Sequence, residues 1–417
     1  MRRIRLRRAA TTVPPTLRLA WLAILLLVGI GPATAASTAG CHNGENFGRW
    51  LESVKQEAAG LGVSRATLAE ALDGVTFDPS IVARDHHQGV FQQSFLEFSD
   101  RMVARYRLET GAQMLRRYAD LFARIEHQYG VPGPVIVAFW GLESDFGTNM
   151  GKLPILRALA TLAYDCRRPE FFRPQLIDAL RVAERGDLPP SEMLGDWAGE
   201  LGHTQFTPSD YFRYAVDYDG DGRRDLIHSV PDAMASTANF LVNLGWRRGE
   251  PWTQEVRVPA DLAWQEADLA IQHPRSQWAH WGVTSSDGRP LPADNLPASL
   301  LLPMGRFGPA FLAYPNFQAY LKWNSALVYS TTAAYFANRL AGAPPVSRAT
   351  RPIARLDGHQ LLELQQLLVH QGIKVGDLDG KLGLTTRAAI KEAQLKLGLP
   401  ADSYPTPELL EKLRVQR

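Results

Sequence analysis

The spacing of apolar residues predicts helices over most of the chain. Segments such as FGRWLESVKQEAAGLGVS and TLAEALDG place apolar residues three to four positions apart and end at glycine, as amphipathic helices do. The spacing continues in residues 111–144, where a Pro-Gly-Pro turn separates two helices, and it returns in ILRALATLAYDC, FFRPQLIDALRVAERG and PDAMASTANFLVNLGW. We therefore expect a mainly α (α+β) protein.

The pattern changes in residues 251–310. There EVRVP, WGVTSSDGRPLP and ASLLLPMG are short β-like runs interrupted by Asp-Gly and proline, which predicts a small β-containing subdomain. Helical spacing resumes in NFQAYLKWNSALVYSTTAAYFANRLAG. Residues 342–355 are rich in Pro, Ser and Arg without periodicity and are interpreted as a linker. Residues 356–417 form a separate helical unit.

The first 35 residues have the composition of a secretory signal peptide. MRRIRLRR is basic, LAWLAILLLVGIG is apolar and ATA is a small-residue cleavage site, which are the three parts of such a signal. The apolar run is shorter than the roughly 20 residues that a membrane-spanning helix needs. We therefore assign residues 1–35 to a signal peptide and residues 41–341 to the main domain.

Composition and charge exclude some classes of protein. The 417 residues are 45% hydrophobic and 21% charged, which fits two or three globular domains with a sizeable core. The formal net charge is +2 and falls to about −4 once the six arginines of the signal peptide are removed. Because the mature chain is not basic overall, we expect no general binding to nucleic acid.

Two cysteines, Cys41 and Cys166, remain after cleavage. In an oxidising compartment the simplest interpretation is one disulfide that ties the mature N-terminus to the body of the protein. The alternative is a lipid anchor on Cys41, since TAGC resembles a lipoprotein site. Against the anchor, Thr38 stands where leucine is usual, and Cys41 lies well past the apolar run.

A carboxyl group ends the apolar run at residues 135–142. Glu143 follows VIVAFWGL, which carries no charge, and Asp145 comes two residues later. Burial disfavours the charged form of a carboxyl group and raises its pKa. A Glu143 that is protonated near neutral pH can donate a proton to a glycosidic oxygen. The alternative is a surface glutamate at a helix end.

The motifs between residues 141 and 246 favour the catalytic interpretation. GLESDFG, GKLPILRALATLAYDCRRPEFF, GDWAGELGHTQFTPSDYFRYAVDYDGDGRRDL and ANFLVNLGW come in an order that resembles the lytic murein transglycosylase B family, from about residue 44 to residue 341. The resemblance implies a periplasmic enzyme with a lysozyme-like catalytic domain and Glu143 as its single acid/base. It implies cleavage of the β-1,4 bond between N-acetylmuramic acid and N-acetylglucosamine in peptidoglycan. The C6 hydroxyl of the muramic acid attacks, which leaves 1,6-anhydro ends.

A single acid suits that reaction, whereas an ordinary glycosidase needs two carboxyl groups. Asp145, two residues after Glu143, is expected to point elsewhere. Glu200 stands where members of the family usually carry a small apolar residue, and it is interpreted as surface-exposed or as altering the cleft. The alternatives to a transglycosylase are a muramidase that uses water and a non-catalytic wall-binding scaffold.

The resemblance also implies residues of the cleft. Gln205 and Phe206 in GHTQFTPSDY would meet the sugar N-acetyl group and form the floor of the groove. In LKWNSALVY, Asn324 and Tyr329 would line the cleft near the acid, and Trp323 replaces a common tyrosine as a stacking surface.

Three further polar residues accompany these motifs. Arg167 and Arg168 in CRRPEFF are candidates to bind lactyl or peptide carboxylates, with a solvated arginine pair as the alternative. His203 in GHTQF is expected at the surface.

An acidic loop, DYDGDGRRDLIHSVPD, resembles the front half of an EF-hand. Asp217, Asp219 and Asp221 alternate and Gly222 stands at the sixth position, so carboxylate oxygens can converge on a hard cation. The twelfth position is His228, a poor calcium ligand, and the family resemblance implies Asp232 as the closing ligand. We expect competence for a structural Ca²⁺, with no cofactor required for the chemistry; an acidic turn without metal is the alternative.

The C-terminal segment LQQLLVHQGIKVGDLDGKLGLTTRAAIKEAQLKLGL resembles a small three-helix peptidoglycan-binding domain. Its glycines and Asp379 would set the turns. The expected core positions are Leu364, Leu368, Ile390 and Leu395. The implied partner is the peptidoglycan glycan strand, bound by a monomer, and association with other cell-wall enzymes stays open.

Overall fold

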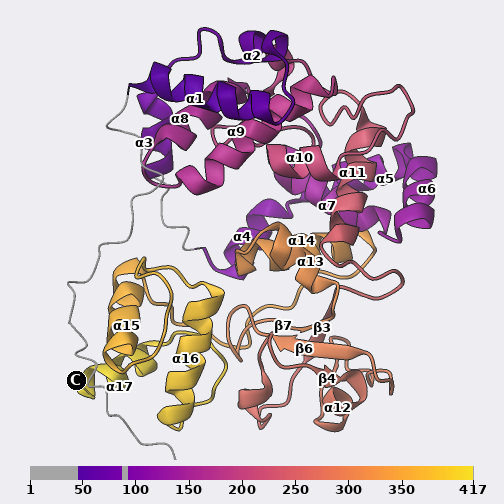
Figure 1. Cartoon of the computed structure of the whole chain (residues 1–417). Helices are drawn as coiled ribbons and strands as arrows, with labels where there is room; N and C mark the ends of the chain where they lie inside the picture. The colour runs from indigo at the N-terminus through magenta and orange to yellow at the C-terminus, as the bar shows by residue number, and fades with distance from the viewer. Residues whose placement is uncertain (1–45, 87–92, 417) are drawn as a thin grey trace, which may run out of the picture. The chain divides into compact units, whose positions relative to one another are not determined.

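The computed structural model of the chain describes residues 46–86 and 93–416 (Figure 1). The predicted signal peptide and Cys41 lie outside the described residues. Among the residues that are described, no helix is long and apolar enough to cross a membrane.

Helices form most of the main domain, as the apolar spacing predicted. Before the sheet, the structure contains α1 (Phe47–Gly60), α2 (Arg65–Leu72), α3 (Pro79–His86), α4 (Phe95–Met102), α5 (Arg105–Arg117), α6 (Ala119–Tyr129), α7 (Gly133–Ser144), α8 (Ile155–Tyr164), α9 (Pro169–Glu184), α10 (Pro208–Tyr214) and α11 (Val230–Asn243). Two short strands that the sequence analysis missed, β1 (Leu153–Pro154) and β2 (Leu194–Gly195), pair antiparallel.

Helix α7 is buried along almost its whole length. Residues 135–142 are all buried, because this uncharged stretch has no polar face to turn toward water. The helix starts after Pro132, where a proline costs no helical hydrogen bond. It ends where Asp145 adopts a left-handed backbone with φ of 51°. Helix α14 (Leu327–Leu340) packs against it (Figure 1).

The predicted β-containing subdomain is a five-stranded sheet. Its strands are β3 (Thr253–Arg257), β4 (His273–Pro274), β5 (Thr284–Ser285), β6 (Pro297–Leu301) and β7 (Ala310–Ala313), in the order β4-β6-β7-β3-β5. All its pairs are antiparallel. Helix α12 (Arg275–His280) brings the buried Trp278 into a core with Val256, Leu300 and Leu312. Helices α13 (Phe317–Trp323) and α14 return the chain to the helical part.

The segment 342–355 contains neither helix nor strand, but it is held against the main domain. The backbone N–H of Ser347 donates to Glu255 of β3 at 2.8 Å. The N–H of Thr350 donates to the carbonyl oxygen of Phe307 at 3.0 Å. The extended segment is therefore anchored at two points.

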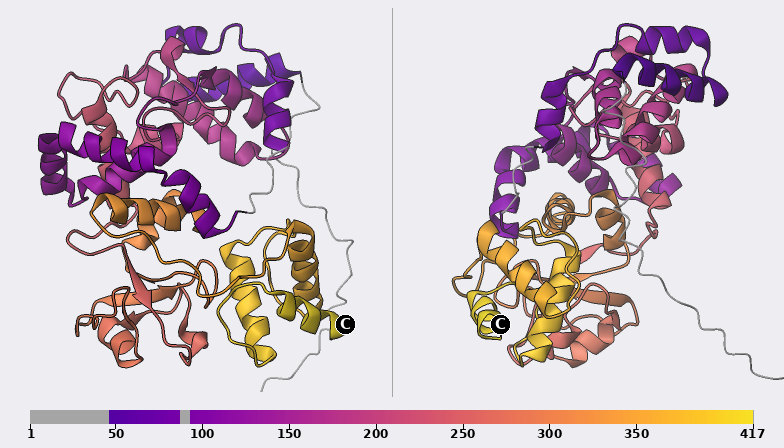
Figure 2. Two further views of the ribbon diagram at one scale, coloured as in Figure 1. Left: turned by 180° about the vertical axis from the view of Figure 1, so that it is seen from behind. Right: turned by 60° about the vertical axis from the view of Figure 1, so that its left-hand side comes forward.

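Residues 356–417 contain α15 (Gly358–His370), α16 (Leu384–Lys396) and α17 (Pro407–Val415), which pack on one another (Figure 2). Leu364, Leu368 and Ile390 are buried in their core, as expected. Leu395 was expected there, but it is 53% exposed. Ala393, one helical turn after Ile390, takes the inward position, because residues three apart share a helix face and residues five apart do not.

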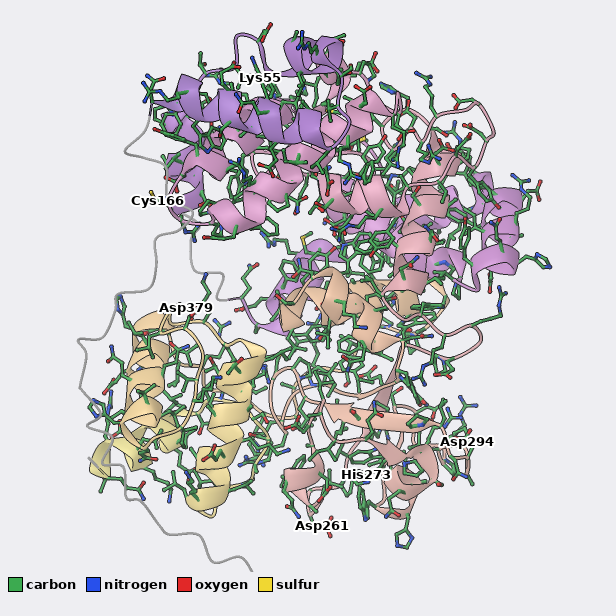
Figure 3. The ribbon with its side chains drawn as sticks, in the orientation of Figure 1. Lys55, Cys166, Asp261, His273, Asp294 and Asp379 are labelled. Atoms are coloured by element: carbon green, nitrogen blue, oxygen red, sulfur yellow. The ribbon has the colours of Figure 1, made fainter. Side chains whose placement is uncertain are left out.

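Asp379 lies in the turn between α15 and α16 (Figure 3). One of its carboxylate oxygens accepts from the backbone N–H of Lys381 at 2.9 Å and from the amide of Gln365 at 3.4 Å. Asp379 therefore stabilises the turn, in agreement with its expected role.

Candidate active site

Glu143 lies in the last turn of α7, where two other helices bring polar hydrogens to one of its oxygens. The indole nitrogen of Trp323, the last residue of α13, donates to Oε1 of Glu143 at 2.9 Å. The hydroxyl of Tyr329, in the first turn of α14, donates to the same oxygen. Both donors reach Oε1, so a proton bound to this carboxyl group resides on Oε2.

The surroundings give Glu143 an unusual pKa. Its pKa is raised to about 7: burial is the main cause and the carboxylate of Asp196 adds to it, while the hydrogen bonds from Tyr329 and Trp323 act in the opposite direction. Because the pKa lies near neutrality, Glu143 can give up a proton in one step and take one back in the next.

An aromatic cluster fixes the position of Trp323. Its ring lies 4.3 Å from that of Phe139, 5.1 Å from Phe240 and 5.7 Å from Phe206, between ring centroids. Phe206 is buried, so it supports Trp323 from behind. The cluster holds the indole N–H toward Glu143.

The loop between residues 195 and 206 carries a second group of acids. Antiparallel bridges join Gly195 to Leu201 and Leu201 to Phe206, which gives the loop a fixed backbone. Asp196 accepts hydrogen bonds from the backbone N–H groups of Ala198 and Glu200 at 2.8 and 2.9 Å. Burial nevertheless raises the pKa of Asp196. Asp196 was not predicted from the sequence, although an Asp three residues before a glycine, as in GDWAGE, is a turn signal.

Glu200 is not a solvated surface residue. Burial raises its pKa to about 8, with further contributions from the neighbouring carboxylates of Asp196, Glu143 and Asp210. It lines a pocket together with Asp196, Trp197 and Phe171. Of the two interpretations from the sequence, the structure favours an altered cleft.

Gln205 has a left-handed backbone with φ of 49°, a conformation that is uncommon outside glycine. Its side-chain nitrogen donates to the carbonyl oxygens of Gly202 at 2.8 Å and Met150 at 3.3 Å. Gln205 therefore joins the acidic loop to the segment that follows α7. Its predicted contact with a sugar N-acetyl group stays a prediction.

Arg167 and Arg168 both pair with Asp85 of α3, whose carboxylate is buried. Nη1 of Arg167 lies 2.6 Å from Oδ1 of Asp85, and Arg168 contacts the same oxygen. The two arginine side chains are 40% and 39% exposed. Asp165 belongs to the same group, since one of its carboxylate oxygens lies within 4.8 Å of one of Asp85, so two carboxylates stand beside the two arginines. The predicted binding of lactyl or peptide carboxylates by Arg167 and Arg168 stays a prediction.

The remaining predicted residues near the acid have local partners. The side-chain oxygen of Asn324 accepts from the N–H of Ala326 at 2.9 Å. This bond stabilises the turn that leads into α14. Asp145 pairs with Arg107 at 2.9 Å and accepts from the hydroxyl of Tyr106. Asp145 therefore has charged and polar partners of its own, as expected for a residue that is not a catalytic partner of Glu143.

The expectation for His203 is wrong. His203 is buried, and its Nδ1 accepts a hydrogen bond from the indole nitrogen of Trp140 at 3.0 Å. Burial lowers the pKa of His203 to about 4, so the ring is neutral and can accept this bond. The sequence motif alone did not reveal that Trp140 faces it.

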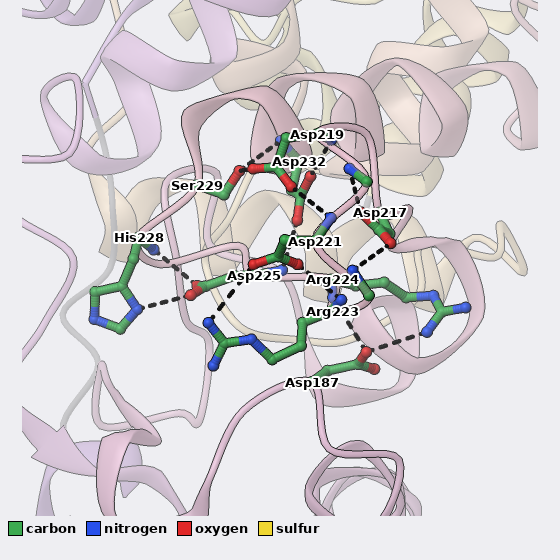
Figure 4. A network of polar contacts seen from close by, with 12 residues as sticks. Asp187, Asp217, Asp219, Asp221, Arg223, Arg224, Asp225, His228, Ser229 and Asp232 are labelled. Carbon is green, nitrogen blue, oxygen red and sulfur yellow. Dashed lines mark hydrogen bonds and ion pairs between the residues drawn. The ribbon is translucent and has the colours of Figure 1, made fainter.

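The predicted cation loop brings Asp217, Asp219 and Asp221 together (Figure 4). One carboxylate oxygen from each lies within 4.8 Å of the other two. Gly222 has φ of 93°, which allows the sharp turn of such a loop. The three oxygens and this turn fit a Ca²⁺ ion.

Asp232 lies beside this loop, and its carboxylate already accepts hydrogen bonds from the backbone (Figure 4). It accepts from the backbone N–H groups of Tyr218 at 2.7 Å and Asp225 at 2.8 Å. It is not one of the three residues whose oxygens converge. Its predicted role as the closing ligand stays a prediction, and its observed role is to hold the backbone of the loop.

Cys166 follows α8 (Figure 3) and is disulfide-bonded. The sequence contains one other cysteine, Cys41, which lies outside the described residues.

The fold and the site together define a mainly helical protein with a carboxyl acid at the end of a buried helix, hydrogen-bonded by an indole and a phenol. Sequence comparison agrees. Residues 46–338 match the family described as "Transglycosylase SLT domain", and residues 357–413 match "Putative peptidoglycan binding domain". The chain therefore belongs to the transglycosylase SLT domain family.

Individual relatives support this assignment. The chain is 32% identical over 240 residues to membrane-bound lytic murein transglycosylase B of Escherichia coli, a match that covers 57% of this chain and 64% of that protein. The SltB3 structure from Pseudomonas aeruginosa, in complex with NAG-anhNAM-pentapeptide, is 40% identical with a TM-score of 0.83, over 89% of this chain and 100% of that one. The Escherichia coli Slt35 structure in complex with calcium is 28% identical with a TM-score of 0.60, over 71% and 92%.

Proposed function

We propose that this protein is a lytic transglycosylase that cleaves the β-1,4 bond between N-acetylmuramic acid and N-acetylglucosamine in peptidoglycan and leaves 1,6-anhydromuramic acid ends. The observation that carries the proposal is the hydrogen bonding of Glu143, whose Oε1 accepts from both Trp323 and Tyr329. The complex of SltB3 with NAG-anhNAM-pentapeptide supports the same product class.

In the first step, Glu143 acts as an acid. Its pKa of about 7 keeps a large fraction of the group protonated at neutral pH. The proton on Oε2 passes to the glycosidic oxygen as the bond from that oxygen to C1 of the muramic acid breaks, and the N-acetylglucosamine side leaves as an alcohol. The hydrogen bonds to Oε1 then stabilise the carboxylate that remains.

In the second step, the same group acts as a base. The C6 hydroxyl of the muramic acid attacks C1, and its proton returns to the Glu143 carboxylate. A bond from O6 to C1 replaces the broken bond, so atoms and protons balance without water. Glu143 is ready for another cycle.

The neighbouring acids fit a mechanism with one catalytic carboxyl group. Asp145 is paired with Arg107, and Asp196 accepts from backbone N–H groups. Glu200, whose pKa is about 8, is mainly neutral at pH 7 and is a poor base for activating water. These properties favour internal attack over hydrolysis.

Product analysis tests the proposal. Purified protein is incubated with murein sacculi, and the soluble products are measured by mass spectrometry. A transglycosylase gives anhydro ends, which are lighter by one water than the reducing ends that a muramidase gives. Reducing ends alone would contradict the proposal, and binding without any soluble product would support the scaffold alternative.

We also propose that residues 356–417 bind the peptidoglycan strand and raise the local concentration of substrate for the catalytic domain. The match of residues 357–413 to a peptidoglycan-binding family supports this role. Because peptidoglycan lies in the periplasm, a protein that acts on it is expected there. The signal peptide predicted from residues 1–35 supports this location.

A structural Ca²⁺ ion is a further part of the proposal. Asp217, Asp219 and Asp221 would hold it, since their oxygens converge, and the relative Slt35 was solved in complex with calcium. Bound Ca²⁺ would neutralise the mutual repulsion of the carboxylates and rigidify the loop. It would take no part in bond cleavage.

A further inference from the structure

Glu200 has a carboxyl group with no partner for its polar atoms among the described residues. Its backbone N–H and carbonyl oxygen both bond to Asp196, at 2.9 Å each, so the main chain at this position is fixed. No hydrogen bond or ion pair to the side chain occurs within the described part of the chain. Glu200 is half-buried and lines a pocket, so its carboxyl group is available to a hydrogen-bonding group from outside the chain.

The pocket beside Glu200 has the character of a sugar site. It has a volume of about 230 Å³, larger than the roughly 150 Å³ cavity that accommodates a benzene ring. Phe171 and Trp197 line it, and Phe171 is 48% exposed. Aromatic faces of this kind pack against the C–H groups of a sugar, and Glu200 and Thr207 supply polar groups for its oxygens.

The pocket lies close to the catalytic acid. Glu200 is near enough to Glu143 of α7 for the charge on Glu143 to shift its protonation. Tyr329 of α14, which donates to Glu143, is likewise affected by the charge of Glu200. The two carboxyl groups therefore lie near enough for one bound glycan to reach both.

Burial first, and then the charges around it, favour the protonated form of Glu200. Asp196 on the same loop, Glu143 on α7 and Asp210 on α10 all disfavour a further negative charge at this point. The cation that lines the pocket, Arg168, is paired with Asp85. A neutral carboxylic acid, unlike a carboxylate, can donate a hydrogen bond.

We propose that Glu200 is a further substrate-contacting residue. In its neutral acid form it donates a hydrogen bond to a hydroxyl or carbonyl oxygen of a sugar ring that occupies the pocket formed with Phe171, Trp197 and Thr207. The inference rests on the proposed glycan-cleaving function. It gives the active site two carboxyl groups that act in their protonated form, one as catalyst and one as hydrogen-bond donor.

The test compares Glu200→Gln and Glu200→Met with the wild type on soluble murein fragments. Glutamine keeps a donor and does not ionise, whereas methionine has a similar length without a donor. We expect Glu200→Gln to retain kcat/KM near neutral pH and Glu200→Met to lose roughly tenfold, since one hydrogen bond to substrate is lost. Glu170→Gln is the control, because Glu170 is an exposed acid of α9.

The pH dependence separates this role from a purely structural one. In the wild type, kcat/KM should fall by about one decade per pH unit above the pKa of Glu143, and ionisation of Glu200 should add a further fall of roughly tenfold, so the alkaline limb is steeper where Glu200 loses its proton. In Glu200→Gln it should fall by about one decade per unit. The folding of each variant is checked by circular dichroism, and Glu200→Gln alone suffices for the slope measurement if Glu200→Met does not fold.

Three outcomes would overturn the inference. They are wild-type kcat/KM in Glu200→Met, an unchanged alkaline slope in Glu200→Gln, or reducing-end products in the wild type that disappear in Glu200→Gln. The last outcome would make Glu200 a base for water. Failure of the proposed function itself is distinguishable, because the wild type would then release no soluble product, or only reducing ends that persist in Glu200→Gln.

Discussion

The hydroxyl of Tyr329 donates a hydrogen bond to Oε1 of Glu143, although the two residues are 186 positions apart in the chain. The bond joins the end of one buried helix to the start of another. It opposes the burial that raises the pKa of Glu143, so the balance of these two effects sets the proton affinity of the proposed catalytic acid.

Removal of the acid should abolish turnover. We expect Glu143→Gln to lower the rate of murein solubilisation by roughly a thousandfold, since an amide cannot transfer the proton. Asp145→Asn is the matched control, because it changes an acid two residues away that pairs with Arg107. It should cost less than about tenfold, through a weakened ion pair. Equal losses in the two variants would restore a mechanism with two carboxyl groups.

Removal of the tyrosine hydroxyl should shift the pH profile. The hydrogen bond from Tyr329 lowers the pKa of Glu143, so Tyr329→Phe should move the alkaline limb of kcat/KM upward by about one pH unit. The rate should also fall, because the carboxylate formed in the first step loses a donor. Tyr335→Phe, in the same helix, is the control and should leave the limb in place. A downward shift in Tyr329→Phe would contradict this account.

Ionisation of Glu143 should lower the stability of the folded protein at alkaline pH. Folding raises the pKa of Glu143 from 4.5 to about 7, so the folded state holds this proton more tightly than the unfolded state. The stabilising protonation is complete at low pH and is lost as the pH rises through the folded pKa. At about pH 8, Glu143→Gln should therefore be more stable than the wild type by on the order of 2 kcal/mol. Urea unfolding near pH 8 and pH 5 measures the difference, which should shrink at the lower pH.

Calcium should stabilise the acidic loop. Addition of Ca²⁺ should raise the unfolding temperature of the full chain by a few degrees, and a chelator should reverse the shift. Asp217→Asn should remove this response, because one of three converging carboxylates is lost. Asp261→Asn changes an exposed acid of the β-containing subdomain and should respond like the wild type. No shift in the wild type would refute the calcium proposal.

The disulfide should tie the N-terminus to the main domain. Cys166 is disulfide-bonded, and we expect Cys41→Ser and Cys166→Ser to lower the free energy of unfolding equally, by about 2–4 kcal/mol. A reducing agent should lower the wild type to the same level. If Cys41→Ser alone released the protein from membranes, the lipid-anchor alternative would hold.

The sequence by itself determined the helical architecture, the β-containing subdomain and the identity of the acid. Each depends on short-range pattern: apolar spacing specified the helices, and the uncharged run before Glu143 predicted a buried carboxyl group. The E-S-x-x-G and G-x-x-Q-F motifs added the family resemblance. Leu395 shows the limit of such patterns, because its outward direction depends on which face α16 turns toward its neighbours.

Only the tertiary structure decided the chemical surroundings of the acid. It brought Trp323 and Tyr329 to one oxygen of Glu143, buried His203 against Trp140, and placed Glu200 in a pocket near the acid. These contacts join residues tens to nearly two hundred positions apart, so no local pattern records them. The physical reason is that pKa values and hydrogen bonds depend on distances through space, which packing sets and sequence spacing does not.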